Sequence, residues 1–201
     1  MFRNARQYKL HNVINAKRLP FKFDLNPSTI ICTWFYCGAS PIAPGTIGSL
    51  GAYPVFYYIL NNAKTFDNAV LMLHIITALI FIMGWLATAA FHQRTLLFDH
   101  QSIVIDEVAG QLLTCTLTFP WLYELYQNST AAAKLGLSFP GYVFLICFIA
   151  FRYFDITKPL FLRYIDKNFK TAFGVMIDDI FAGLFAVGTI YILCAIHAAI
   201  V

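Results

Sequence analysis

Carboxylates are concentrated in two short segments of this chain. Seven of its ten Asp and Glu residues lie there, and they include two adjacent pairs. The seven are Asp99, Asp106, Glu107, Asp155, Asp166, Asp178 and Asp179. Adjacent carboxylates repel each other unless a cation lies nearby, and oxygen-only ligand sets suit hard cations such as Mg²⁺. The adjacent pairs Asp106-Glu107 and Asp178-Asp179 are therefore the predicted Mg²⁺ ligands.

Hydroxyl and basic side chains near these acids have the chemistry to bind phosphate. Guanidinium and ammonium groups neutralise its charge and donate strong hydrogen bonds to its oxygens. The predicted phosphate-binding residues are Thr46, Ser49, Arg152, Lys158 and Arg163. Gly45, Gly48 and Gly51 lie beside the two hydroxyls, and their spacing is more typical of tight helix packing than of phosphate binding.

A structural role is the alternative for each acid taken by itself. Asp and Glu cap helix N-termini and pair with cations such as Arg152 and Lys158. A structural role explains the presence of both adjacent acid pairs less well, because an unpaired charge at a membrane interface costs several kcal/mol. His100 is the imidazole nearest to the acids, and a single imidazole disfavours a zinc site.

The composition is that of a membrane protein. The 201 residues are 59% hydrophobic and 12% charged, whereas soluble domains carry about 25% charged residues. No formal charge occurs in the 26 residues of 68–93 or in the 22 residues of 180–201. Each stretch is long enough to cross a bilayer as a helix. A cation and a phosphate bound by such a protein suggest a phosphorylated lipid.

Five membrane-spanning helices are expected to position these residues. They are predicted at residues 47–60, 69–91, 103–123, 140–156 and 178–200. A short helix at 27–36 precedes them, with Asn26 as its N-cap, and Pro159 is expected to end the fourth span at Lys158. The first span is short for a complete crossing. The predicted fold class is an all-α polytopic membrane helical bundle.

The basic residues predict the orientation. Residues 1–24 form a basic arm, after which no cleavable signal sequence is expected. With this arm in the cytoplasm, twelve Lys and Arg residues lie inside, and only Lys64 and Lys134 lie outside. The positive-inside rule then predicts a cytoplasmic N-terminus, an external C-terminus and a cytoplasmic site. Spans one, three and five would direct their N-termini, which bind anions, toward that face.

A short repeat links the third and fifth spans. Asp106–Gly110 and Asp179–Gly183 share the pattern D-x-x-A-G, so acid and glycine lie four residues apart on one helical face. Small residues let membrane helices approach closely. The repeat therefore predicts that these two spans pack together with their acids side by side.

Four segments resemble the phosphatidylglycerophosphatase A family in order and spacing. They cover about residues 38–190 and are Ser40–Ser49, Asp99–Glu107, Arg152–Pro159 and Gly174–Gly183. The resemblance implies a Mg²⁺-dependent lipid phosphatase of the bacterial inner membrane, which hydrolyses phosphatidylglycerophosphate to phosphatidylglycerol and phosphate. Residues 25–201 would form its membrane-embedded phosphatase domain, and the arm at 1–24 lies outside the resemblance.

The resemblance and the residue chemistry together give the expected roles. The catalytic residues are expected to be Asp99, His100, Asp106, Asp155 and Asp179. His100 or one of the acids would protonate the leaving alkoxide. The expected partners are the bilayer and the lipid substrate, with no nucleic acid.

A cation transporter or channel subunit is the competing hypothesis. Its acids would line an ion path through the depth of the membrane. The predicted second and fifth spans carry no charge through their middles, which favours the phosphatase. A third hypothesis, a lipid-binding scaffold, predicts binding without turnover.

Overall fold

The part of the chain that the structure describes is built from helices alone. The computed structural model describes residues 24–96, 100–127, 136–159 and 171–200. The elements are α2 (Pro27–Cys32), the 3-10 helix η1 (Cys37–Ala39), α3 (Pro44–Leu50), α4 (Tyr53–Asn62), α5 (Phe66–Thr95), α6 (Ile105–Gln127), α8 (Phe139–Thr157) and α10 (Ala172–Ile200). The predicted all-α class is confirmed for these residues. The predicted basic arm, apart from Asp24, lies outside them.

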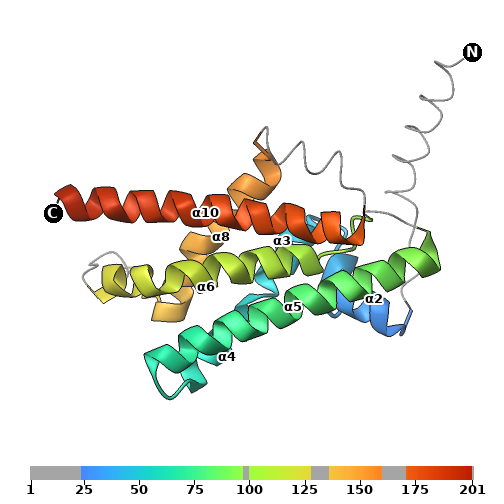
Figure 1. Ribbon diagram of the computed structural model, residues 1–201, viewed down its shortest axis with the longest axis horizontal. Coiled ribbons are helices and arrows are strands. Elements are labelled where there is room, and N and C mark those ends of the chain that lie inside the picture. The colour runs from blue at the N-terminus through green and yellow to red at the C-terminus, as the bar shows by residue number, and fades with distance from the viewer. Residues whose placement is uncertain (1–23, 97–99, 128–135, 160–170, 201) are drawn as a thin grey trace, which may run out of the picture.

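Helix α6 is the central element of the bundle. It packs against α5, α8 and α10, and Figure 1 shows it running alongside α10. The first turns of α6 and α10 and the last turn of α5 lie at one end of the molecule, and the C-terminus lies at the other (Figure 1). The fully buried side chains of the core include Leu73, Phe91, Leu112, Phe119, Phe151 and Met176. Residues far apart in the sequence therefore meet at the end formed by the first turns of α6 and α10.

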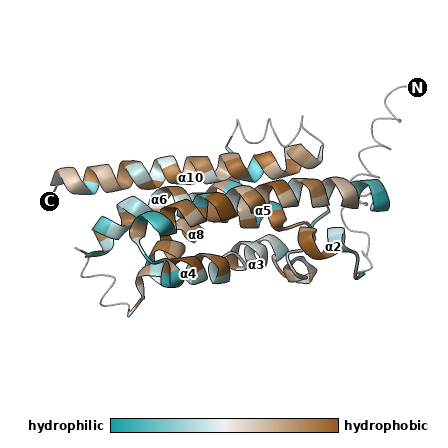
Figure 2. Ribbon diagram, turned by 60° about the horizontal axis from the view of Figure 1, so that its bottom comes forward, coloured by the Kyte–Doolittle hydropathy of each residue, from teal (hydrophilic) through white to brown (hydrophobic). Residues whose placement is uncertain are grey.

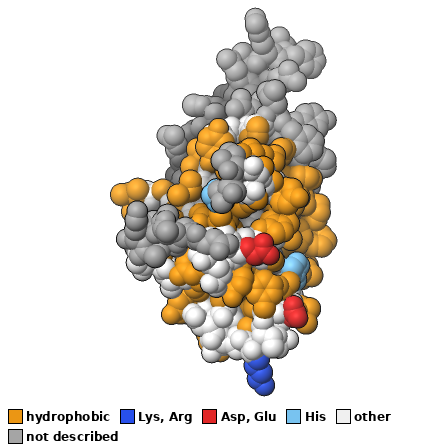
Figure 3. Space-filling model, turned by 90° about the vertical axis from the view of Figure 1, so that its left-hand side faces the viewer, with side chains coloured by type: hydrophobic (Ala, Val, Ile, Leu, Met, Phe, Trp, Pro, Cys, Tyr) orange, Lys and Arg blue, Asp and Glu red, His pale blue; other side chains and the backbone are white. Residues whose placement is uncertain are grey.

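Three of the described helices, α5, α8 and α10, are long and apolar enough to cross a membrane. Hydrophobic residues predominate along these helices in Figure 2, and Figure 3 shows a largely hydrophobic surface at the end that carries the C-terminus. Helix α6 has 23 residues but is more polar, and it buries Gln111, Thr114 and Thr118 among its neighbours. These features are those of a membrane helical bundle. They do not establish the predicted number of five crossings.

The predicted helix at 47–60 is wrong as a single element. It is broken into α3 and α4, which meet at Gly51 and Ala52. Pro54 explains the break, because it has no N–H to donate to the carbonyl of Leu50 and its ring disfavours a continuous helix. The indole Nε1 of Trp34 instead donates to the carbonyl of Gly51 at 2.9 Å, which satisfies an oxygen that the break exposes.

The other predicted helices are present with shifted ends. Helix α8 ends at Thr157, just before Lys158 and Pro159, as predicted. Lys158 itself adopts a left-handed conformation (φ 41°). Helix α10 begins at Ala172 rather than at residue 178, because the hydroxyl of Thr171 accepts a hydrogen bond from the amide of Gly174 at 3.0 Å. The acids at 178 and 179 therefore lie in the second turn of α10 and not at its N-terminus. Helix α2 begins after Asn26 as predicted but ends at Cys32, before three left-handed residues at 34–36.

The predicted close packing of α6 on α10 is confirmed at two glycines. A Cβ at Gly110 would lie 2.6 Å from the backbone oxygen of Asp179, and one at Gly183 would lie 2.9 Å from the backbone oxygen of Gly110. Neither distance leaves room for a side chain. The two glycines of the repeat thus bring the helix backbones together, and Asp179 is carried to the first turn of α6.

Candidate active site

Three carboxylates from two helices form the centre of the site. Asp106, Glu107 and Asp179 each offer an oxygen, and these atoms all lie within 4.8 Å of one another. Asp106 and Asp179 are 9% and 5% exposed, and Glu107 is half-buried. The structure therefore brings together three of the four residues that the sequence predicts as Mg²⁺ ligands.

The first turn of α6 is fixed by the segment that precedes it. The amide of Val104 donates to the carbonyl of Cys32 at 2.9 Å, which ties this segment to α2. Gly38 of η1 lies so close that a Cβ there would be 2.1 Å from the backbone oxygen of Ser102. Within the turn, the amide of Glu107 donates to Oδ1 of Asp106 at 3.0 Å. These contacts position both acids of the first pair.

Arg152 lies beside the carboxylates and is held by two neighbours. Its Nη1 forms an ion pair with Oδ2 of Asp155 at 2.6 Å and donates to Oγ of Ser49 at 3.3 Å. Ser49 is fully buried, and its hydroxyl donates to the carbonyl of Gly45 at 2.9 Å. The Nε of Arg152 is buried and has no hydrogen-bond partner among the residues that the structure describes. In this structure Ser49 and Asp155 therefore orient Arg152, whose Nε remains available to an anion.

Lys158 and Asp178 form a second charged pair. The Nζ of Lys158 donates to Oδ2 of Asp178, which is 6% exposed. Successive residues of a helix point about 100° apart, so Asp178 faces Lys158 at the end of α8 while Asp179 faces α6. The structure does not bring Asp178 into the three-carboxylate cluster.

Helix α3 touches the cluster through a glycine. A Cβ at Gly45 would lie 2.2 Å from Oε1 of Glu107 and 3.4 Å from Nη1 of Arg152. Thr46, the next residue, is half-buried in the first turn of α3. The packing role that the sequence favours for the three glycines is confirmed, since Gly48 lies against Val104 and Gly51 against Trp34.

Gly45→Ala is expected to lower activity with little change in thermal stability. The added methyl would displace Oε1 of Glu107, which is the end of a flexible side chain, so the fold can accommodate it. Changes around a metal site typically cost about 10–100-fold. Phosphate release and the thermal midpoint in detergent would be measured beside Gly188→Ala, because a Cβ at Gly188 meets nothing within 4 Å. Wild-type turnover of Gly45→Ala would mean that Glu107 needs no fixed position.

The structure does not place three other predicted site residues in the carboxylate cluster. Asp99 and Arg163 lie outside the described residues. His100 is 3% exposed, and its Nδ1 accepts a hydrogen bond from the amide of Ser102 at 3.2 Å. That bond gives His100 a part in shaping the turn before α6, and its catalytic role stays a prediction.

The carboxylate cluster fits a hard divalent cation. Its donors are all oxygens, and within the described part of the chain Oε2 of Glu107 is buried without a hydrogen-bond partner. Leaving such an oxygen unsatisfied costs about 1–3 kcal/mol, and more for a charged group. Arg152 and Lys158 are already paired with Asp155 and Asp178. A cation at the cluster would therefore satisfy an oxygen and a charge that these two ion pairs leave uncompensated.

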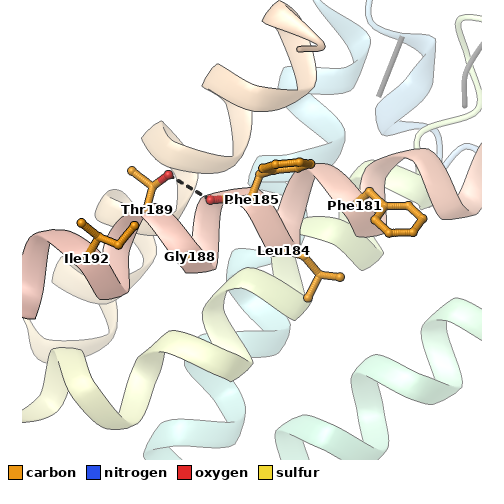
Figure 4. A pocket seen from close by; sticks show the side chains of 6 residues that line it. All are labelled: Phe181, Leu184, Phe185, Gly188, Thr189 and Ile192. Atoms are coloured by element: carbon orange, nitrogen blue, oxygen red, sulfur yellow. Dashed lines mark hydrogen bonds between the residues drawn. The ribbon is translucent and has the colours of Figure 1, made fainter. Parts of the chain in front are cut away.

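Other features near the site lack the groups that hydrolysis needs. A groove of about 390 Å³ follows α10 and is lined by Phe181, Leu184, Phe185, Gly188, Thr189 and Ile192 (Figure 4). Its hydroxyl, on Thr189, donates to the carbonyl of Phe185 at 3.0 Å.

Burial raises the pKa of the Cys32 thiol to about 12, so this residue is not a thiolate nucleophile at neutral pH. Among the described residues, the carboxylate cluster is thus the candidate reaction centre.

One buried polar residue beside the cluster was not singled out from the sequence. Gln111 lies one turn after Glu107 on α6 and is fully buried, although its Oε1 has no hydrogen-bond partner. The sequence holds a signal for it, because an amide four residues after an acid lies on the same helical face.

The comparisons with known proteins agree with this geometry. The family model described as Phosphatidylglycerophosphatase A (PgpA) matches residues 30–194. A Phosphatidylglycerophosphatase A of Escherichia coli is 32% identical over 166 residues, which are 83% of this chain and 83% of the relative. One of Haemophilus influenzae is 30% identical over 171 residues, covering 83% of this chain and 88% of the relative.

A third relative carries a different name. A Putative phosphatidylinositol-3-phosphatase of Bacteroides thetaiotaomicron is 31% identical over 161 residues, which are 78% of this chain and 87% of the relative. No solved structure matches the chain at a significant level. Because the family model covers most of the chain and two curated relatives bear the family's name, the chain belongs to the phosphatidylglycerophosphatase A family.

Proposed function

We propose that this protein is a Mg²⁺-dependent phosphatase that hydrolyses phosphatidylglycerophosphate to phosphatidylglycerol and phosphate. One observation carries the proposal. Asp106, Glu107 and Asp179 lie close together, with Arg152 beside them, at one end of an apolar helical bundle. Membership of the phosphatidylglycerophosphatase A family, and the names of two relatives, support the substrate.

The three clustered carboxylates would hold the cation. Bound Mg²⁺ would supply positive charge to the phosphate oxygens and favour attack by water or by a carboxylate. Asp178 serves this site indirectly in the proposal, because it pairs with Lys158.

The basic groups would bind and orient the phosphate. Arg152 presents its buried Nε, since Asp155 and Ser49 hold Nη1. Lys158, Thr46 and Arg163 are proposed as further contacts. A fixed guanidinium beside the phosphorus stabilises the charge that develops in the transition state.

Proton transfer completes the proposed reaction. The ester bond between phosphorus and the glycerol oxygen breaks, and the alkoxide must receive a proton. His100, Asp99 or a carboxyl of the cluster is the proposed donor. His100 is buried and lies five residues before the start of α6 in the sequence.

The proposed placement is the bacterial inner membrane, with five crossings and the site on the cytoplasmic face. Three apolar helices, the relatives' bacterial origin and the excess of basic residues in the predicted inside segments support it. Reporters fused to the two ends of the chain should then report opposite sides of the membrane. Reporters on the same side would contradict an odd number of crossings.

Phosphate release from defined lipids tests the function. Purified full-length protein in mixed micelles should release phosphate from phosphatidylglycerophosphate, lose this activity in EDTA and regain it with Mg²⁺. Phosphatidylinositol 3-phosphate belongs in the assay because of the third relative's name. Equal release in EDTA would refute the metal dependence, and faster release from the inositol lipid would refute the proposed substrate.

The competing cation-transporter hypothesis gains no support from the described residues. The clustered acids lie in the first turn of α6 and the second turn of α10, and Asp155 lies near the end of α8. A transport path requires polar groups through the membrane depth, whereas these acids gather at one end of the bundle.

A further inference from the structure

Gln111 is an amide buried beside the acids without full hydrogen bonding. Its side chain is 0% exposed, and its Nε2 donates to the sulfur of Cys115 at 3.4 Å. Its Oε1 is buried and has no hydrogen-bond partner in the described ranges 24–96, 100–127, 136–159 and 171–200. A buried amide oxygen in this state is destabilising, because it has lost its hydrogen bonds to water without replacement. The hydrogen bond to Cys115 therefore does not explain why a polar amide is buried at this position.

A second residue with an unpartnered oxygen, Glu107, lies one helical turn before Gln111. Among the described residues, its Oε2 is also buried without a hydrogen-bond partner. Residues four apart on a helix are neighbours, with Cβ atoms about 5–6 Å apart. A cation or its water shell at this helical face could satisfy the unpartnered oxygens of both residues. An additional carboxylate would add repulsion to the cluster, and a neutral amide does not.

We propose that the side-chain oxygen of Gln111 is a neutral oxygen donor to the cation site, on the membrane side of Glu107. The proposal rests on the proposed function, because it assumes that the three-carboxylate cluster holds a divalent cation. It adds a neutral amide from the second turn of α6 to a site otherwise formed by acids. Gln111 acts through the cation site and is a positioning residue for the reaction.

Binding of Mn²⁺ to the purified full-length chain, followed by electron paramagnetic resonance, tests the proposal without turnover. Gln111→Met removes the amide but keeps its length, and the Mn²⁺ dissociation constant is expected to rise about 10–100-fold. The thermal midpoint in EDTA should stay equal or rise, because an unsatisfied buried polar group has been replaced by an apolar one. Gln111→Glu retains an oxygen at the same place and should bind Mn²⁺ within a few-fold of wild type.

Thr116→Val is the matched control. Thr116 is also buried in α6, but its hydroxyl hydrogen-bonds to Thr77 of α5 at 3.0 Å. This change should lower the thermal midpoint and leave Mn²⁺ affinity unchanged. A purely structural role for Gln111 predicts the same result for Gln111→Met as for Thr116→Val.

The outcomes separate this proposal from the proposed function. Wild-type Mn²⁺ affinity in Gln111→Met, together with lost binding in Glu107→Gln, would overturn the role of Gln111 and leave the carboxylate site standing. Absence of Mn²⁺ binding in the wild-type chain would overturn the cation site itself and the role of Gln111 with it. Weakened binding in Gln111→Met that Gln111→Glu restores would support both.

Discussion

Asp179→Asn is expected to reduce lipid phosphatase turnover by at least about 10²-fold, because changes in the surroundings of a metal site alone cost about 10–100-fold. Asp179 is the clustered carboxylate that comes from α10, while the other two come from α6. Asparagine has nearly the same shape but lacks the negative charge, so the helix packing should persist. Phosphate release from phosphatidylglycerophosphate in saturating Mg²⁺ is the measurement.

The thermal stability of Asp179→Asn, unlike its activity, should not fall. Without a cation, the three carboxylates repel one another, so removing one charge should keep or raise the thermal midpoint in EDTA. Asp67→Asn is the control, because Asp67 is exposed in the first turn of α5 and should lose no activity. Full activity of Asp179→Asn would show that Asp179 has only a structural role. A lower thermal midpoint in EDTA would show that its charge stabilises the fold.

Gly110→Ala is expected to destabilise the bundle and to lower activity. A Cβ at this position would lie 2.6 Å from the backbone oxygen of Asp179 and 2.6 Å from the ring of Phe151. Neither neighbour is a flexible chain end, so α6 and α10 must move apart. Such overpacking costs about 1–3 kcal/mol, and the displacement also moves Asp179 away from the other two carboxylates.

Gly188→Ala provides the matched comparison for this prediction. A Cβ at Gly188 meets nothing within 4 Å, and alanine favours a helix over glycine by about 0.5–1 kcal/mol. Its thermal midpoint in detergent should therefore be equal to or above that of the wild type, while Gly110→Ala falls below it. Equal midpoints for the two variants would show that the helix contact at Gly110 is not tight.

The local signals in the sequence were sufficient for much of the fold. Uncharged stretches predict α5 and α10, and Pro159 predicts the end of α8. The shared D-x-x-A-G pattern predicts the α6–α10 contact, because an acid and a small residue four apart fix one helical face. The break at Gly51 is not part of the prediction, although Pro54 is a local signal for it; only the structure shows that the distant Trp34 donates to the carbonyl of Gly51.

The sequence by itself determined that acids, basic groups and apolar helices occur together, and it identified the family pattern that contains them. Only the tertiary structure showed that Asp178 lies outside the three-carboxylate cluster and pairs with Lys158. The D-x-x-A-G repeat already pairs Asp179 with Asp106, but the sequence predicts both Asp178 and Asp179 as Mg²⁺ ligands because they are adjacent and have the same side chain. One helical step of about 100° directs the first to Lys158 and the second to Asp106 and Glu107. The direction of each acid depends on where α8 and α6 lie around α10, and the long-range packing of the bundle determines those positions.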